Sequence, residues 1–385
     1  MGETNIKKFR ANRKKRLYYF DYSLFLMLII LFAFGMVMLY SVSAYQGNLK
    51  FGDSAYYLKR QALFGAVGML ILFVMIKVGY SFLDRLSGLL YFVALLLCVA
   101  VNFMGSSGGG SVRWFRLGPL NVQPSEIAKV AVIIFLAHLI SRSNKGLRST
   151  ANILKAFFLV GPFVVVIAYS NLSTAIIVAG IAFIMLFVAG KKSMVFIVIL
   201  IIGALVVALF IIIQGYRSNR ISVWLHPEDY PDGFQTMQAL YAIGSGGVFG
   251  RGLGASMQKL GFVPAANNDM IFSIICEELG IIGAIGLIIL YILFAWRCLV
   301  IAVNAVDQFG SFLVIGVMTH ISLQVVLHVA VCTNTIPNTG VTLPYISYGG
   351  SALLMLLFEA GIVLSVSAKI PIPLEADDEG TVLTR

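Results

Sequence analysis

The sequence predicts an all-α polytopic membrane protein with about ten transmembrane helices and both termini in the cytoplasm. Of its 385 residues, 59% are hydrophobic and 12% are charged. Soluble domains are about half apolar and about a quarter charged. The apolar residues gather in long runs, and Lys and Arg lie mainly on one side of them. These features exclude a soluble enzyme, a disordered chain and a disulfide-stabilised scaffold.

Each predicted span approaches the roughly 20 residues that a helix needs to cross the hydrocarbon layer. Only helices satisfy their own backbone at such lengths in lipid. The first run exceeds the apolar segment of a signal peptide, and further spans follow it, so it is predicted to stay uncleaved. In order, the spans are expected at 20–42, 60–78, 87–104, 125–141, 153–170, 172–189, 194–213, 270–296, 310–333 and 350–368.

The distribution of Lys and Arg sets the predicted orientation. With the N-terminus inside, 18 of the 28 Lys and Arg residues lie on the cytoplasmic side and nine on the outer side. This excess favours cytoplasmic termini and explains the net charge of +11 without nucleic acid. The domains are then a basic cytoplasmic tail (1–19), a membrane domain (20–368) and a cytoplasmic tail (369–385). The four cysteines are typical apolar filler, with no C-x-x-C pair.

Three long loops are predicted on the outer side, at 105–124, 214–269 and 334–349. Long loops in compact domains are usually functional. We therefore expect the chemistry, or a partner, on the outer face.

Glu126 and Lys129 are charged residues at the start of the fourth span. Ionisable groups within spans are costly and suggest function. Their i, i+3 spacing places opposite charges on one helix face. They are expected either to fix helix packing as a buried ion pair or to line a substrate cavity, and both roles can hold together.

Asp269 ends the longest outer loop, directly before an apolar run. One interpretation is a helix N-cap, for which Asp is a preferred residue. The other is a general base at the membrane boundary, within reach of a lipid-borne substrate and of sugars in water. Glu277 and Glu278 are expected to bond neighbouring helices or backbone, and Glu359 has no evident partner.

The glycine-rich run IGSGGVFGRGLG contains Arg251, and Lys259 follows it. Successive glycine amides can cradle a phosphate, but no G-K-[ST] or strand–helix context supports nucleotide binding. Tight turns are the structural alternative, and contact with a diphosphate head group is the functional one. Arg113 and Trp114 in the first outer loop suit a membrane-interface belt or recognition of a diphosphate or sugar.

His320, Gln324 and His328 form one polar stripe on the ninth span. The two histidines are about 12 Å apart along the helix axis, too far for one metal ion. We expect interhelical hydrogen bonds here.

Four segments, in order along almost the whole chain, resemble the SEDS family (shape, elongation, division and sporulation proteins, FtsW/RodA/SpoVE). They are RWFRLGPLNVQPSEIAK at 113–129, NLSTA at 171–175, the segment from QTMQ to EELG at 235–280 and PNTGVTLPYISYGGS at 337–351. The sequence departs from the family where NNDMIF replaces TDFIF around the aspartate. It also has NLSTA where many members have PDLGTA, which removes an acidic residue at position 171.

The resemblance implies a peptidoglycan glycosyltransferase that polymerises lipid II at the outer face of the cytoplasmic membrane. It would form β-1,4 bonds with inversion and release undecaprenyl diphosphate. The family's essential aspartate falls on Asp269, its paired charges on Glu126 and Lys129, and its outer-loop Arg-Trp on Arg113 and Trp114. Arg251, Lys259 or a divalent cation (Mg or Mn) would also stabilise the diphosphate, with no nucleotide.

The resemblance also implies a class B penicillin-binding protein (FtsI-like) and divisome proteins as partners. The VTLPYISYGGS segment and the basic tail favour the division (FtsW-like) branch at the septum. The elongation and sporulation versions remain alternatives. A lipid II flippase and a non-catalytic scaffold are the rival function classes.

Overall fold

The computed structural model describes residues 18–108, 111–117, 120–143, 149–190, 192–213, 215–264, 266–371, 375–376 and 382–383. The predicted basic tail lies outside the described residues except for its last two, Tyr18 and Tyr19. Most of the predicted C-terminal tail also lies outside them.

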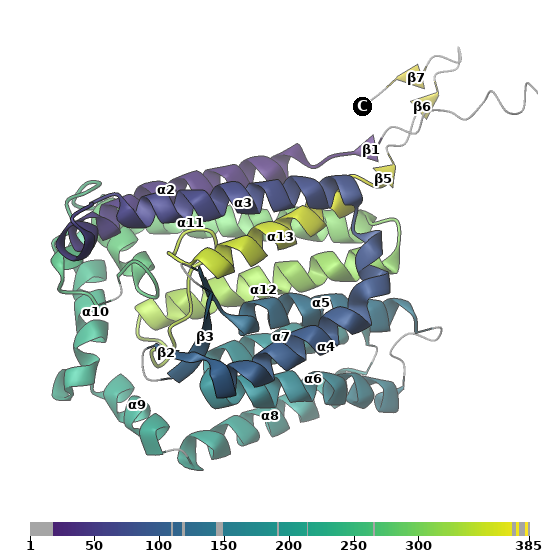
Figure 1. Cartoon of the computed structure of the whole chain (residues 1–385), viewed down its shortest axis with the longest axis horizontal. Helices are drawn as coiled ribbons and strands as arrows, with labels where there is room; N and C mark the ends of the chain where they lie inside the picture. The colour runs from purple at the N-terminus through teal and green to yellow at the C-terminus, as the bar shows by residue number, and fades with distance from the viewer. Residues whose placement is uncertain are drawn as a thin grey trace, which may run out of the picture.

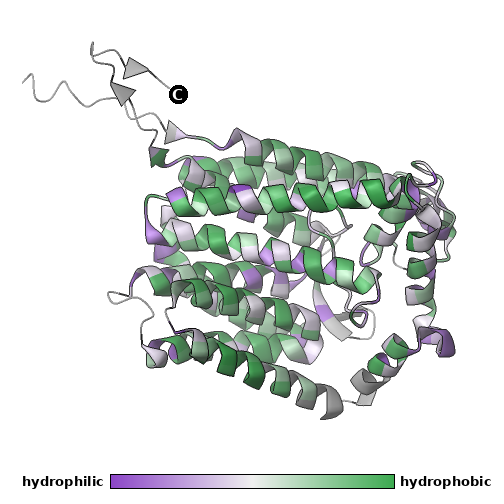
Figure 2. Cartoon of the chain, turned by 180° about the vertical axis from the view of Figure 1, so that it is seen from behind, coloured by the Kyte–Doolittle hydropathy of each residue, from purple (hydrophilic) through white to green (hydrophobic). Residues whose placement is uncertain are grey.

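Ten long helices lie side by side, one for each predicted span (Figure 1). Nine helices of the described chain are long and apolar enough to cross a membrane. The tenth prediction coincides with α8, whose apolar stretch runs at least from Ser193 to Val206. Apolar residues cover the length of the bundle (Figure 2). The ten are α2 (Tyr22–Phe51), α3 (Tyr56–Val78), α4 (Ser81–Met104), α5 (Pro124–Ser141), α6 (Thr150–Ser170), α7 (Leu172–Ala189), α8 (Ser193–Ile213), α11 (Ile271–Asn304), α12 (Gln308–Cys332) and α13 (Gly350–Ser367).

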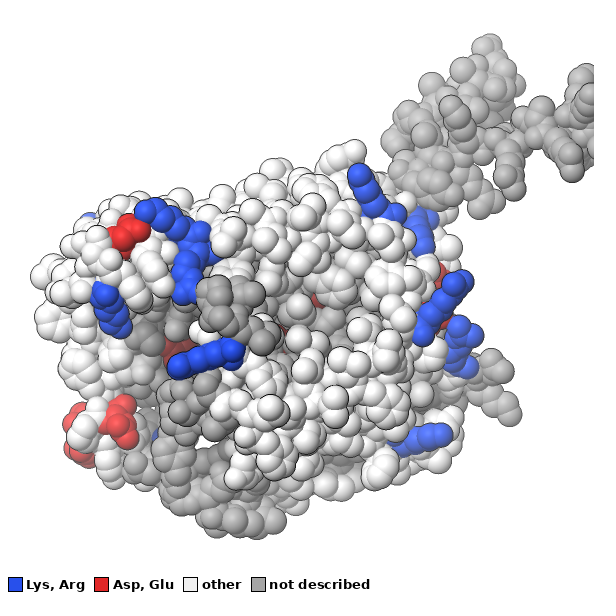
Figure 3. Space-filling model, in the orientation of Figure 1, with Lys and Arg blue, Asp and Glu red and all other residues white. Residues whose placement is uncertain are grey.

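Both described chain ends lie at the same end of the bundle, as an even number of spans requires. Strand β1 (Tyr18–Tyr19) pairs antiparallel with β5 (Ile370–Pro371). Asp21 caps α2 through a hydrogen bond from the Leu24 amide, and its carboxylate lies 2.6 Å from Arg297. On the face that Figure 3 shows, Lys and Arg gather toward the two ends of the bundle and are absent from the middle. We call the end with the three long loops the outer end, following the predicted orientation.

The outer segments contain more regular structure than the sequence predicts. The first outer loop folds into a small sheet, β2 (Ser106–Gly108), β3 (Ser111–Leu117) and β4 (Leu120–Val122), in the order β2-β3-β4. The second holds α9 (Gly215–Leu225), η1 (Pro227–Asp229), η2 (Pro231–Gly233), α10 (Phe234–Gly246) and η3 (Gln258–Leu260). Two further short strands, β6 (Glu375–Ala376) and β7 (Val382–Leu383), pair with each other near the C-terminus. The chain is therefore largely, but not entirely, helical.

Helix α11 is broken at Gly280, whose φ of 67° and ψ of −168° are open to glycine and strained for other residues. The glycine-rich run after α10 fits into this break. The amides of Arg251 and Gly252 donate to the carbonyls of Glu277 and Glu278, and the Ile281 and Ile282 amides donate back to Gly247 and Val248. Irregular backbone at membrane depth is tolerated when protein satisfies it in this way. The expectation of tight turns and close packing is therefore confirmed for this run.

A Gly280→Ala variant is expected to lose at least about 3 kcal/mol of unfolding free energy. Its Cβ would overlap the Gly250 amide and the Val248 carbonyl, and its backbone would be strained. Gly286→Ala is the matched control in the same helix, because a Cβ there meets no atom within 4 Å. Thermal unfolding in detergent measures both. Equal stability of the two variants would contradict this account.

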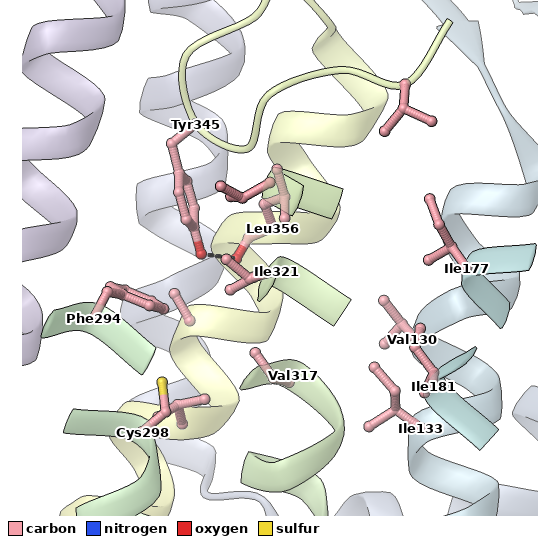
Figure 4. Packing of buried hydrophobic residues seen from close by; sticks show 14 of the residues in the cluster. Val130, Ile133, Ile177, Ile181, Phe294, Cys298, Val317, Ile321, Tyr345 and Leu356 are labelled. Atoms are coloured by element: carbon pink, nitrogen blue, oxygen red, sulfur yellow. Dashed lines mark hydrogen bonds between the residues drawn. The ribbon is translucent and has the colours of Figure 1, made fainter. Parts of the chain in front are cut away.

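The third outer loop dips back into the bundle. Tyr345 is buried among the helices, and its hydroxyl donates to the Leu356 carbonyl at 3.3 Å (Figure 4). Tyr345 has a φ of 65°, which is strained for a tyrosine. The carbonyl of the preceding Pro344 accepts from Tyr291 of α11. These contacts fix the loop at the outer end, next to the residues described below.

Candidate functional site

Asp269 lies at the outer end, two residues before α11 begins. The N-cap of α11 is Met270, and no side chain caps the helix, so the capping interpretation of Asp269 is wrong. Instead, the Gln235 side-chain amide donates to Asp269 Oδ1 at 3.4 Å. The preceding residues are held by the third outer loop, because the Tyr348 amide donates to the Asn267 carbonyl and the Ser347 hydroxyl to the Asn268 carbonyl. The aspartate is therefore held between α10 and this loop.

The surroundings of Asp269 raise its pKa from 3.8 to about 6. Burial is the largest cause, because it penalises the charged carboxylate. The Asp269 amide, the Gln235 side chain and the positive charge of Arg113 oppose it and lower the pKa. A base with a pKa near the working pH is well suited to accept a proton during a reaction.

Arg113 and Trp114 lie side by side on β3 at the outer end, and both are partly exposed. Arg113 is close enough for its charge to act on Asp269. It also lines a small cavity with Gln123, Ser125 and Asn171. The structure therefore brings the predicted arginine and the predicted base together.

Glu126 and Lys129 form a buried ion pair, with Lys129 Nζ 2.9 Å from Glu126 Oε2. Lys129 also donates to Gln324 of α12 at 3.3 Å. The Gln324 amide in turn donates to the Thr342 carbonyl at 2.9 Å, in the third outer loop. In the same loop, Gly340 borders Asp269 Oδ2. One loop thus connects the ion pair to the base.

Arg251 and Lys259 lie in a different cluster beside the break in α11. Lys259 is buried, and its Nζ is 2.8 Å from Glu278 and 2.9 Å from the Ser41 hydroxyl. Arg251 lies 3.4 Å from Glu277. Both cations are thus paired with carboxylates. As expected, Glu277 also accepts from backbone, the Met257 amide, and Glu278 from a neighbouring helix, through Ser41 of α2. Their predicted contact with a substrate stays a prediction.

The polar stripe on α12 makes the interhelical contacts that the sequence predicts at His320 and Gln324, and it also bonds the third outer loop, which the sequence does not predict. His320 lies 2.8 Å from Glu359 of α13. His328 bonds the Val341 carbonyl at 2.7 Å, alongside the Gln324 contact given above. His320 is the partner that the sequence could not assign to Glu359, because 39 residues separate the two.

Within the part of the chain that the structure describes, Asp269 belongs to no group of side chains that could hold a metal ion. Among the described residues, only His226, Glu228 and Asp229 form a group of three that could hold an ion, and all three are exposed. Asp269 has Gln235 and Arg113 as neighbours rather than further carboxylates. A cation here would depend on the oxygens of a bound diphosphate, in the way that Mg²⁺ commonly binds.

Comparison with known proteins gives a consistent result. The FtsW/RodA/SpoVE family model, described as "Cell cycle protein", matches residues 21–370. The chain is 38% identical to a probable peptidoglycan glycosyltransferase FtsW of Trichlorobacter lovleyi, over 94% of this chain and 97% of that protein. It is 37% identical to stage V sporulation protein E of Bacillus subtilis, over 90% and 96%.

Solved structures give the same picture. A chain from a peptidoglycan synthase complex, described as coordinating polymerization and crosslinking, has a TM-score of 0.78 and 27% identity. It is matched over 91% of this chain and 98% of that one. The rod shape determining protein RodA of Thermus thermophilus has a TM-score of 0.69 and 26% identity, over 91% and 97%.

Proposed function

The chain belongs to the FtsW/RodA/SpoVE family, and from this premise we propose that it is a peptidoglycan glycosyltransferase that polymerises lipid II. The observation that carries the proposal is Asp269, a carboxylate that lies at the outer end near Arg113. Burial raises its pKa to about 6. A base at this boundary can reach a sugar in water while the substrate's lipid stays in the membrane.

In the proposed reaction, Asp269 accepts the proton of the 4-hydroxyl of the acceptor's N-acetylglucosamine. That oxygen forms a β-1,4 bond with the anomeric carbon of the donor, and the bond from that carbon to the diphosphate breaks. The carbon is inverted from α to β, undecaprenyl diphosphate leaves with the bonding electrons, and Asp269 later releases its proton to water. Each charge and proton is then accounted for.

Negative charge develops on the leaving diphosphate and needs nearby positive groups. Arg113 is the best placed, because it is partly exposed and lies near Asp269. Trp114 on the same strand offers a flat surface to a sugar ring. Lys129 can add positive charge from within the membrane domain, because Gln324 connects it by hydrogen bonds to the third outer loop. A divalent cation bound with the diphosphate would add to this charge, and no step depends on it.

The rate of polymerisation is expected to fall as the pH drops through about 6, by about tenfold per unit below it. The sign follows because a base must be deprotonated and the Asp269 pKa is raised. An ordinary Asp would keep its activity down to about pH 4. Initial rates from about pH 5 to 8 test this, with the unfolding midpoint at each pH as the control for intact protein. A flat profile across pH 6 with folded protein would contradict the assignment.

We place the enzyme in the cytoplasmic membrane, in cell-wall synthesis during division, with a class B penicillin-binding protein and divisome proteins as partners. The similarity to a chain from a peptidoglycan synthase complex supports a crosslinking partner. Relatives from the division and sporulation branches match about equally well. Comparing polymerisation with and without an FtsI-like, a RodA-type or a sporulation-type transpeptidase would assign the branch.

A lipid II polymerisation assay in detergent micelles tests the function itself, because micelles offer no second leaflet to flip into. Glycan formation by the purified chain and its transpeptidase supports the enzyme. Lipid II translocation in liposomes that persists in Asp269→Asn, without glycan formation by wild type in micelles, would favour a flippase. A wild-type chain that recruits its transpeptidase without either activity would indicate a scaffold.

A further inference from the structure

The side chain of Gln235 hydrogen-bonds one oxygen of the Asp269 carboxylate, and the other oxygen lies beside Gly340. Gln235 Nε2 donates to Oδ1 at 3.4 Å. The other oxygen, Oδ2, borders Gly340, where an added Cβ would have Oδ2 at 3.7 Å as its single neighbour within 4 Å. Because Gly340 has no side chain, none projects from that position toward Oδ2. The two carboxylate oxygens therefore have different surroundings.

Gln235 is held by a fixed helix rather than by a loose loop. It lies in the first turn of α10, and the run that follows α10 is bonded to α11 by four backbone hydrogen bonds across the break at Gly280. Asp269 lies two residues before α11, separated from it by the N-cap residue Met270. The donor and the acceptor are thus carried by two elements that are locked to each other, which suits a contact that must keep one geometry.

On the basis of the proposed function, we propose that Gln235 is a positioning residue: its amide holds Oδ1 of Asp269 so that Oδ2 faces the acceptor hydroxyl. An amide donor to a carboxylate also favours the charged form that a base requires. Gln235 therefore has two effects on Asp269. It orients the carboxylate, and it lowers the pKa, so that the carboxylate stays deprotonated at more acidic pH.

Few charged groups among the residues that the structure describes shift the pKa of this carboxylate. The titratable side chains on the elements around Asp269 include Arg113 of β3, Cys276 of α11, Cys332 and His328 of α12, and Tyr348 of the third outer loop. Arg220 of α9 also donates to the Asn338 carbonyl of that loop. Cys332 contacts the Asp269 carbonyl at 3.5 Å, and His328 lies beside Cys332. Within the described chain, Arg113 is the one that acts on the carboxylate through its charge. Removing Gln235 leaves Arg113 in place, so the change in pH dependence reports on the amide.

The test compares initial polymerisation rates of wild type, Gln235→Ala and Gln235→Asn at about pH 6 and about pH 8.5. Asparagine keeps the amide but is one methylene too short to reach Oδ1. If loss of the amide raises the pKa of Asp269 by about one unit, the deficit at pH 6 exceeds that at pH 8.5 by about fivefold. A loss of orientation adds a decrease in kcat at both pH values. Gln238→Ala is the matched control, because within the described chain Gln238 of the same helix has no side-chain hydrogen bond.

The outcomes separate this inference from the proposed function. An equal deficit at both pH values with a lowered unfolding midpoint would show that Gln235 is only structural and would overturn the inference. Wild-type rates in both Gln235 variants would do the same while leaving Asp269 as the base. A fully active Asp269→Ala variant would overturn the proposed function itself. The Asn variant keeps the test valid if the Ala variant fails to fold.

Discussion

An Asp269→Ala variant is expected to polymerise lipid II about 10²- to 10⁴-fold more slowly than wild type, because this is the usual contribution of a general base. Asp269 takes no part in capping α11, and its side chain bonds no helix other than α10, through Gln235 at 3.4 Å, among the described residues, so its removal is expected to leave the helix framework intact. The measurement is the initial rate of glycan formation by purified protein with its transpeptidase.

Two further variants sharpen this result. Asp269→Asn keeps the size of the side chain but cannot accept the proton, and it should be as inactive as alanine. Asp232→Ala removes an exposed acid from the same outer segment and should keep wild-type activity. Binding of lipid II should survive in both Asp269 variants. Glycan formation at the wild-type rate by Asp269→Asn would refute the role of a base.

A Lys129→Met variant is expected to lose about 3–5 kcal/mol of unfolding free energy, because Glu126 would be left buried and unpaired. The Lys129 side chain is 2% exposed and the Glu126 side chain 9%. The double variant Glu126→Leu/Lys129→Met removes both charges and should recover most of that stability. Thermal or denaturant unfolding in detergent measures the three proteins.

Activity of the double variant decides between the two expected roles of the pair. If Lys129 also serves the substrate, the double variant is folded but at least about 100-fold slower, which is the usual effect of losing a charge that stabilises the transition state. A folded double variant with wild-type activity would make the pair purely structural. Lys59→Met is the matched control, because Lys59 pairs with Asp53 at 2.7 Å but is 68% exposed. It should change stability by no more than about 0.5 kcal/mol.

The spans could be predicted because helix formation in a bilayer depends on the local sequence alone. An apolar run of sufficient length must satisfy its own backbone, whatever its neighbours are. The same rule explains the errors at the ends. Helix α2 continues to Phe51 through polar residues beyond the predicted end at 42, and it stops where Gly52 adopts a left-handed conformation. Beyond the hydrocarbon, length is set by capping and turns.

Residues of the candidate site could be predicted only where the residue type is unusual for its position in the sequence. Asp269 and the Glu126–Lys129 pair stand out because charges next to apolar runs are rare. Gln235 does not, because an amide in an outer segment is common and its partner lies 34 residues away. The capping interpretation failed for a related reason. Contacts from Ser347 and Tyr348 turn the chain before α11, and such tertiary contacts leave no local pattern.

The contacts between the first and last helices of the bundle, near the β1–β5 pair, have a consequence for biosynthesis. The Asp21 amide donates to the Ser367 hydroxyl across 346 residues, and Gly35 of α2 packs against the backbone of Tyr345 and Ile346. At about 5–20 residues per second, the ribosome needs about 20–70 s to make the second partner after the first. During that time the first helix has reached the membrane but lacks the surface it will bury. Final assembly of the enzyme therefore waits for the last helix to be inserted.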